Sequence, residues 1–218
     1  MTPENISVNG KEISFFNEVL RKATHIGALV IPGGYYLLKL NRIEMLYIMV
    51  PIAVFMVFID ISRLRNWKFW HSFAKKIIGR LIRPKEIDGD FTGASYILTT
   101  VCLTVALYDK PIAITALTFI IVGDAFAALI GRRYGRHKIF GDKSLEGSLS
   151  CLISTLLVAI FVAILFPTMT LTIAISGAVV ATFLEAYPFG IDDNVTVPIL
   201  SGLFMTILGK ILIFYKIT

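Results

Sequence analysis

Seven long apolar stretches set the strongest limit on how this chain can fold. Most approach the roughly 20 residues that a helix needs to cross the hydrocarbon core of a bilayer. The chain as a whole is 56% hydrophobic and only 17% charged over 218 residues, which is too apolar for an ordinary soluble domain. The stretches cover residues 24–40, 43–61, 91–108, 111–131, 147–166, 171–187 and 195–215. We therefore expect an all-α integral membrane protein with about seven transmembrane helices in one bundle.

The seven stretches belong to one domain, residues 1–218. The sequence shows no internal repeat with a period of 20 to 50 residues and no linker rich in Gly/Ser or Pro. The first stretch contains Pro32, Gly33 and Gly34, so we expect it to be kinked or to begin earlier, near Ile13. Because no basic segment followed by an apolar core stands at the N-terminus, we expect no cleaved signal peptide.

Basic residues indicate the orientation of this bundle. Residues 1–23 and the loops 62–90, 132–146 and 188–194 would share one side if the helices alternate, and they hold 16 of the 21 Lys and Arg residues. The positive-inside rule places these segments and the N-terminus in the cytosol and the C-terminus outside, in the inner membrane if the organism is prokaryotic. Residues 66–83 alternate apolar and basic residues, which predicts an amphipathic interfacial helix on anionic headgroups. The net charge of +6 has the same origin, and no nucleic-acid motif is present.

Asp124 stands inside an apolar stretch, where an ionised carboxylate costs at least about 2.5 kcal/mol. We expect it to face the bundle, and we favour a functional role over a pairing with Arg132 or another helix residue that only holds the bundle together. Small residues recur every four positions around it, which lets a neighbouring backbone approach. They are Gly123, Ala127, Gly131 and Gly135.

The loop 132–146 that follows combines cations, glycines and carboxylates, the groups that a metal-bound polyphosphate requires. The arginines taken alone fit a positive-inside loop equally well, whereas the run from Lys143 to Gly147 at the start of a helix favours nucleotide binding. Gly135 to Ser144 imitates a phosphate loop, but the spacing is wrong and we expect no strand before it.

Two further clusters lie on the same predicted side. Glu185, Asp192, Asp193 and Asn194 form an acidic loop without a cation, and a divalent cation would relieve the repulsion between the carboxylates. The alternative is a solvated turn in which Asp193 or Asn194 caps the next helix. Near the N-terminus, one helix face carries Glu18, Arg21, Lys22 and His25, which fits an exposed amphipathic turn as well as a site.

Taken together, these motifs resemble the family of dolichol kinases, phytol kinases and yeast-type diacylglycerol kinases. The residues that carry the resemblance are Glu18, Arg21, Lys22 and His25, then Gly123, Asp124, Ala127, Ala128, Gly131 and Gly135, then the run from Lys143 to Gly147, and Glu185 with the run from Asp192 to Pro198. The resemblance implies a CTP-dependent kinase that phosphorylates a lipid alcohol. The middle block also resembles phosphatidate cytidylyltransferases, but the Asp192-Asp193-Asn194 ending is more similar to that of the kinases.

Phosphoryl transfer requires charge neutralisation and a group that orients the attacking hydroxyl, so we assign roles as a hypothesis. The Mg²⁺ ligands are expected among Asp124, Glu146, Glu185, Asp192 and Asp193, with Asp192 or Asp193 as the proton acceptor and Lys143 holding the triphosphate. The nucleotide is expected to contact Gly123, Gly131, Arg132, Arg133, Lys143, Ser144, Gly147 and Asn194. The acceptor end is assigned to Arg21, Lys22 and His25.

Two other functions stay open at this point. One is a CDP-lipid synthase similar to phosphatidate cytidylyltransferase, and the other is a small transporter that binds its substrate at Asp124. A polyprenol, phytol or geranylgeraniol, and diacylglycerol all fit as the acceptor, and a homodimer is possible.

Overall fold

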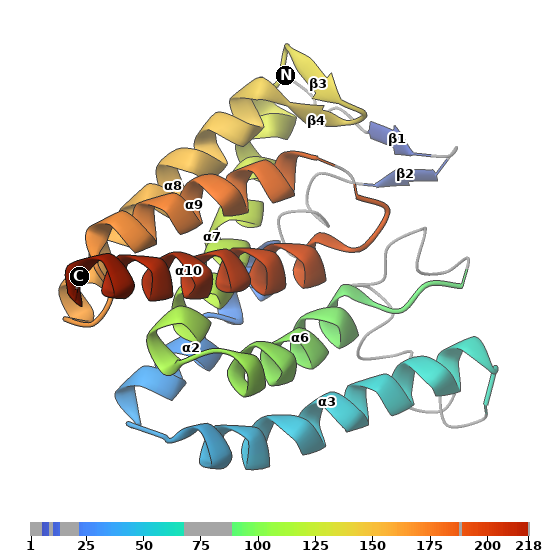
Figure 1. Cartoon of the computed structure of the whole chain (residues 1–218). Coiled ribbons are helices and arrows are strands. Elements are labelled where there is room, and N and C mark those ends of the chain that lie inside the picture. Colours follow the sequence, from blue (N-terminus) through green and yellow to red (C-terminus); the bar gives the residue numbers. More distant parts are fainter. Residues whose placement is uncertain (1–5, 9–10, 14–21, 68–88, 188, 218) are drawn as a thin grey trace.

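The computed structural model describes residues 6–8, 11–13, 22–67, 89–187 and 189–217. Helices dominate it, accompanied by two small antiparallel hairpins (Figure 1). The helices are α2 (Val30–Leu37), α3 (Arg42–Leu64), α6 (Gly93–Leu107), α7 (Lys110–Tyr134), α8 (Leu145–Leu165), α9 (Leu171–Ala186) and α10 (Asp193–Ile217). Strands β1 (Ile6–Val8) and β2 (Lys11–Ile13) form one hairpin, and β3 (Lys138–Phe140) and β4 (Lys143–Ser144) form the other.

The membrane character expected from composition is supported by four helices that are long and apolar enough to cross a bilayer, namely α3, α7, α8 and α10. Helices α6 and α9 are apolar but shorter. The stretch 24–40 does not form one helix, because residues 22–27 are helical, a turn follows, and α2 ends before Lys39, whose φ is 53°. A count of seven transmembrane helices therefore stays a prediction. Most of the predicted interfacial segment 66–83 lies outside the described residues.

Helix α7 forms the centre of the bundle and packs against α2, α6, α8, α9 and α10. Its contact with α8 depends on small residues. A Cβ added at Gly123 would lie 2.9 Å from the Cys151 sulfur, and one added at Gly147 would lie 2.9 Å from the carbonyl oxygen of Ala127. These distances are shorter than ordinary van der Waals contact, so the two backbones approach closely only because both positions are glycine.

Several segments far apart in sequence meet at one end of the bundle. In Figure 1 the connection from α9 to α10 and the start of α6 lie at the right of the bundle, between the β3–β4 hairpin at the top and the end of α3 at the lower right. Local capping fixes two of these helix starts. The Ser144 hydroxyl accepts from the amide of Gly147 at 3.2 Å to begin α8, and Thr92 caps α6 by accepting from the amide of Ser95.

Candidate active site

The buried carboxylate of Asp124 is paired with two residues from the N-terminal part of the chain. Asp124 is 7% exposed on α7, and its Oδ2 accepts a hydrogen bond from the Lys22 ammonium at 2.5 Å. The Nε2 of His25 lies 3.5 Å from the same oxygen. The partner that an intramembrane carboxylate requires is thus Lys22, a residue that the sequence assigned to the acceptor end.

A second cation stands between two further acids. The Lys143 ammonium from β4 forms ion pairs with Glu185 at the end of α9 and with Asp193 at the start of α10, where the distance to Asp193 Oδ2 is 3.6 Å. Burial by itself lowers the pKa of Lys143, but the carboxylates of Glu185 and Asp193 raise it above its ordinary value. Lys143 therefore stays cationic at any physiological pH.

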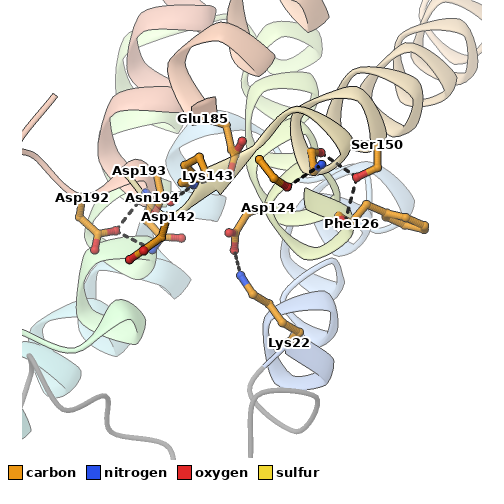
Figure 2. A network of polar contacts seen from close by, with 12 residues as sticks. Lys22, Asp124, Phe126, Asp142, Lys143, Ser150, Glu185, Asp192, Asp193 and Asn194 are labelled. Carbon is orange, nitrogen blue, oxygen red and sulfur yellow. Dashed lines mark hydrogen bonds and ion pairs between the residues drawn. The ribbon is translucent and has the colours of Figure 1, made fainter. Parts of the chain in front are cut away.

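The carboxylates of Asp124, Glu185 and Asp193 converge, with one oxygen of each within 4.8 Å of the others (Figure 2). Two buried atoms beside them lack a hydrogen-bond partner in the described part of the chain, Glu185 Oε2 and Asn194 Oδ1. A hard divalent cation binds carboxylate and amide oxygens of this kind. The unsatisfied oxygens and the converging acids therefore fit a Mg²⁺ ion.

Asp192 and Asp193 take different positions although they are adjacent. Asp192 Oδ1 accepts from the backbone amide of Asn194 at 3.0 Å and from its side-chain amide at 2.6 Å, so Asp192 caps α10. Asp193 turns toward Lys143 instead. The sequence alternative named Asp193 or Asn194 as the cap, whereas in the structure Asp192 is the cap and Asp193 belongs to the carboxylate cluster.

A cavity of about 530 Å³ opens beside this cluster. That volume lies within the range of small-molecule sites in proteins. Its walls come from the segment before and at the start of α6, from β4, from the end of α9 and from the start of α10. Among the lining residues are Asp90, Phe91, Tyr96, Lys143, Glu185, Asp192 and Asp193. Gly190, with φ 76°, allows the turn that brings the last two acids to the cavity.

Sequence comparisons relate the chain to lipid kinases. It is 31% identical over 208 residues, 93% of this chain and all of the relative, to an uncharacterized protein of Rickettsia prowazekii. The CTP-dependent diacylglycerol kinase 1 of Saccharomyces cerevisiae is 26% identical over 89% of this chain and 74% of its own length. The phytol kinase of a Synechocystis strain is 37% identical over 37% of each chain. The chain belongs to this lipid kinase family. Neither a protein-family model nor a solved structure matches it.

Membership in the lipid kinase family agrees with the residues that the structure brings together. Asp124, Lys143, Glu185 and Asp193 come from four different elements and meet at one end of the bundle, as Figure 2 shows together with Lys22, Asp192 and Asn194. Only Lys22 and His25 of the expected acceptor end can be located, because Arg21 lies outside the described residues, as does Glu18 of the same predicted helix face.

Several residues that were predicted to contact the nucleotide make contacts within the fold instead. Gly123, Gly131 and Gly147 lie in the contact between α7 and α8, and the Ser144 hydroxyl caps α8. Arg132 and Arg133 occupy the last turn of α7, where the negative end of the helix dipole stabilises cations. Neither arginine is among the cavity-lining residues. Their contact with the nucleotide stays a prediction.

Glu146 stands apart from the carboxylate cluster. Its Oε1 lies 2.8 Å from His137 Nδ1, and its carboxylate also faces the backbone amide of His137. Glu146 neither lines the cavity nor belongs to the converging acids of the described residues. In the geometry of the structure it braces the β3–β4 hairpin, and its role as a metal ligand stays a prediction.

Sequence reasoning missed Asp60 and the segment from Asp90 to Tyr96. Asp60 is 1% exposed near the end of α3, whereas Asp90, Phe91 and Tyr96 line the cavity. A signal for Asp60 was present, because it is a carboxylate within an apolar stretch just as Asp124 is. No signal in the sequence connected it to the start of α6.

Proposed function

We propose that this protein is a CTP-dependent kinase that transfers the γ-phosphate of the nucleotide to the hydroxyl of a membrane lipid alcohol at the cytosolic face. The convergence of Asp124, Glu185 and Asp193 on one point, flanked by Lys22 and Lys143, carries the proposal. Acids and ammonium groups in this arrangement suit a metal-bound triphosphate. CTP and the lipid alcohol are inferred from the relatives, which are named CTP-dependent diacylglycerol kinases and phytol kinase.

Asp124, Glu185, Asp193 and Asn194 are the residues that would hold Mg²⁺, which neutralises charge on the phosphates when bound. Lys143 is placed to contact the same phosphate oxygens, and the short β3–β4 hairpin that carries it is open to solvent at Phe140. Lys22 keeps Asp124 ionised and oriented. These side chains position the donor in a fixed geometry, which is the main contribution of a protein to phosphoryl transfer.

In the proposed reaction the hydroxyl oxygen of the lipid forms a bond to the γ-phosphorus while the bond between that phosphorus and the bridging β–γ oxygen breaks. The products are a lipid phosphate and CDP. Asp192 lines the cavity and is oriented by Asn194, so its carboxylate is placed to receive the hydroxyl proton. The cavity lies at the end of the bundle that carries the predicted basic loops. The positive-inside rule therefore supports a cytosolic position for it.

The position of a radioactive label tests the reaction type. The full-length protein in liposomes receives either γ-labelled or α-labelled CTP with Mg²⁺, and diacylglycerol, phytol, a polyprenol or phosphatidate as acceptor. We expect the γ-label, and not the α-label, to reach the organic phase with an alcohol as acceptor. Transfer of the α-label to phosphatidate would instead identify a CDP-lipid synthase.

Two variants make the assay specific to the site. Glu185→Gln removes a charge from the carboxylate cluster and should abolish transfer. Glu44→Gln removes an exposed carboxylate from the capping box of α3 and should leave transfer unchanged. Equal activity in both variants would refute the assignment of the site.

A further inference from the structure

A buried acid outside the carboxylate cluster ties α3 to the start of α6. Asp60 Oδ2 accepts from the Thr92 amide at 2.8 Å, from the Thr92 hydroxyl at 2.8 Å and from the Ser95 hydroxyl at 2.6 Å. Three donors at one oxygen satisfy a carboxylate that is 1% exposed. The network therefore fixes the first turn of α6 in one position.

Arg63 extends this network to the residue before that turn. Its Nε donates to Asp60 Oδ1 at 3.2 Å, and its guanidinium also donates to the carbonyl oxygen of Asp90 at 2.5 Å. Both side chains are buried, so solvent does not compete for these contacts. A buried ion pair is weak evidence for added stability, so its role here is taken from the hydrogen bonds that it makes. The geometry specified here is that of the segment from Asp90 to Tyr96.

This segment supplies an aromatic wall to the cavity. Phe91 and Tyr96 line the cavity, and their ring centroids lie 6.3 Å apart in an edge-to-face arrangement. Lys143 and three of the lining acids come instead from β4, the end of α9 and the start of α10, where Leu184, Tyr187 and Ile191 also line the cavity. The start of α6 thus contributes two aromatic rings beside Asp90, opposite the lysine and the remaining acids.

Exposed leucines lie further along the helix that carries Tyr96. Leu103 and Leu107, further along α6, are 46% and 60% exposed. An exposed leucine surface on such a helix is suited to the hydrocarbon region of a bilayer. A molecule with an apolar tail in lipid and a hydroxyl in the cavity would pass the Phe91 and Tyr96 rings.

We propose that Phe91 and Tyr96 form the acceptor subsite, which binds the hydroxyl-bearing end of a membrane lipid alcohol, and that Asp60 and Arg63 are positioning residues for it. This inference rests on the proposed function for the identity of the reaction. It assigns binding of the lipid alcohol to the start of α6 in place of Arg21, Lys22 and His25. The role that remains for Lys22 and His25 is to hold Asp124.

Kinetics with both substrates varied test the subsite in the full-length protein in liposomes. Phe91→Ala and Tyr96→Ala should each raise the KM for the lipid alcohol about tenfold and change the KM for CTP less than twofold. Tyr47→Ala, at a 78% exposed position of α3 outside the cavity, is the matched control and should change neither constant. A rise in the KM for CTP alone would assign the rings to the nucleotide and overturn the proposal.

Asp60→Asn tests the positioning role. It removes the charge that holds Arg63. The KM for the lipid alcohol should therefore rise while the KM for CTP stays within twofold. Asp60→Glu, which keeps the charge, should raise the KM for the lipid alcohol less than Asp60→Asn does. A merely structural role would lower the active fraction, and hence kcat, without altering either KM. That result would overturn the positioning role.

A photoreactive lipid alcohol separates this inference from the proposed function, because labelling requires no turnover. A diazirine placed near the hydroxyl should label residues 90–96, and excess unlabelled alcohol should reduce that labelling at least fivefold. Labelling without phosphate transfer from any nucleotide would refute the kinase while supporting the subsite. Transfer with competed labelling confined to residues 22–27 would support the kinase and overturn the subsite.

Discussion

The pair of Lys22 and Asp124 allows structure and catalysis to be separated by mutation. The two side chains are 3% and 10% exposed, so Asp124→Asn leaves an ammonium group buried without a charged partner. Breaking a buried pair in this way costs about 3–5 kcal/mol, and the amide oxygen that asparagine still offers to Lys22 places the expected loss near the lower limit. For a chain of this size about 3 kcal/mol corresponds to a fall in Tm of roughly 6–12 °C.

Thermal unfolding in detergent measures this loss, and the double variant Lys22→Met with Asp124→Asn distinguishes its two consequences. Removing both charges should recover at least half of the lost stability, whereas phosphate transfer should stay at least about 100-fold below that of the original protein because the proposed metal ligand is still missing. Asp109→Asn is the control, since its pair with Arg42 is exposed and should contribute less than about 1 kcal/mol. A stable single variant, or an active double variant, would refute the reasoning.

Three further predictions concern the packing of α7 against α8, the proposed metal ligands and the charge of Lys143. Gly147→Ala should lower the free energy of unfolding by about 1–3 kcal/mol because the new Cβ meets the Ala127 carbonyl oxygen, whereas Gly34→Ala, with open space around it, should cause no loss in the same denaturation assay. Asp193→Asn should raise the Mg²⁺ concentration for half-maximal transfer at least about tenfold, as a titration of activity measures, and an unchanged requirement would remove Asp193 from the ligand set. Because its carboxylate neighbours raise the pKa of Lys143, its charge and the stability of its ion pairs are complete below the unfolded value of about 10.4 and are lost only as the pH rises through the higher folded value. Transfer measured from pH 8 to 10 should therefore have the same alkaline profile in the original protein and in Lys143→Arg.

Much of the helical architecture could be predicted from apolar length. Helices α7 and α9 begin and end within three residues of the predicted stretches, because charged or turn-forming residues mark both ends. The first stretch was predicted to be kinked at Pro32, Gly33 and Gly34 or to begin near Ile13. In the structure a turn at residues 28–29 interrupts it, and the three residues lie within the short α2 that follows.

The site could be predicted in part. The cost of burying Asp124 and the repulsion within the acidic loop identified most of the residues that meet. Lys143 and Glu185 are 42 residues apart in sequence, and Lys22 and Asp124 are 102 apart. These pairs depend on tertiary contacts, so no local sequence pattern could predict them. Gly123 and Gly131 were assigned both to close helix packing and to nucleotide binding; the packing is confirmed by their contacts, and the nucleotide contact stays a prediction.

The central position of α7 determines which residues can change to give this protein a new substrate preference. A helix in contact with five others accepts few substitutions, and the acid it contributes at position 124 is constrained from every side. The start of α6 is peripheral by comparison, so directed evolution toward alcohols of another length or branching should target residues 91 and 96. Libraries aimed at the interior of α7 should yield mostly unfolded protein.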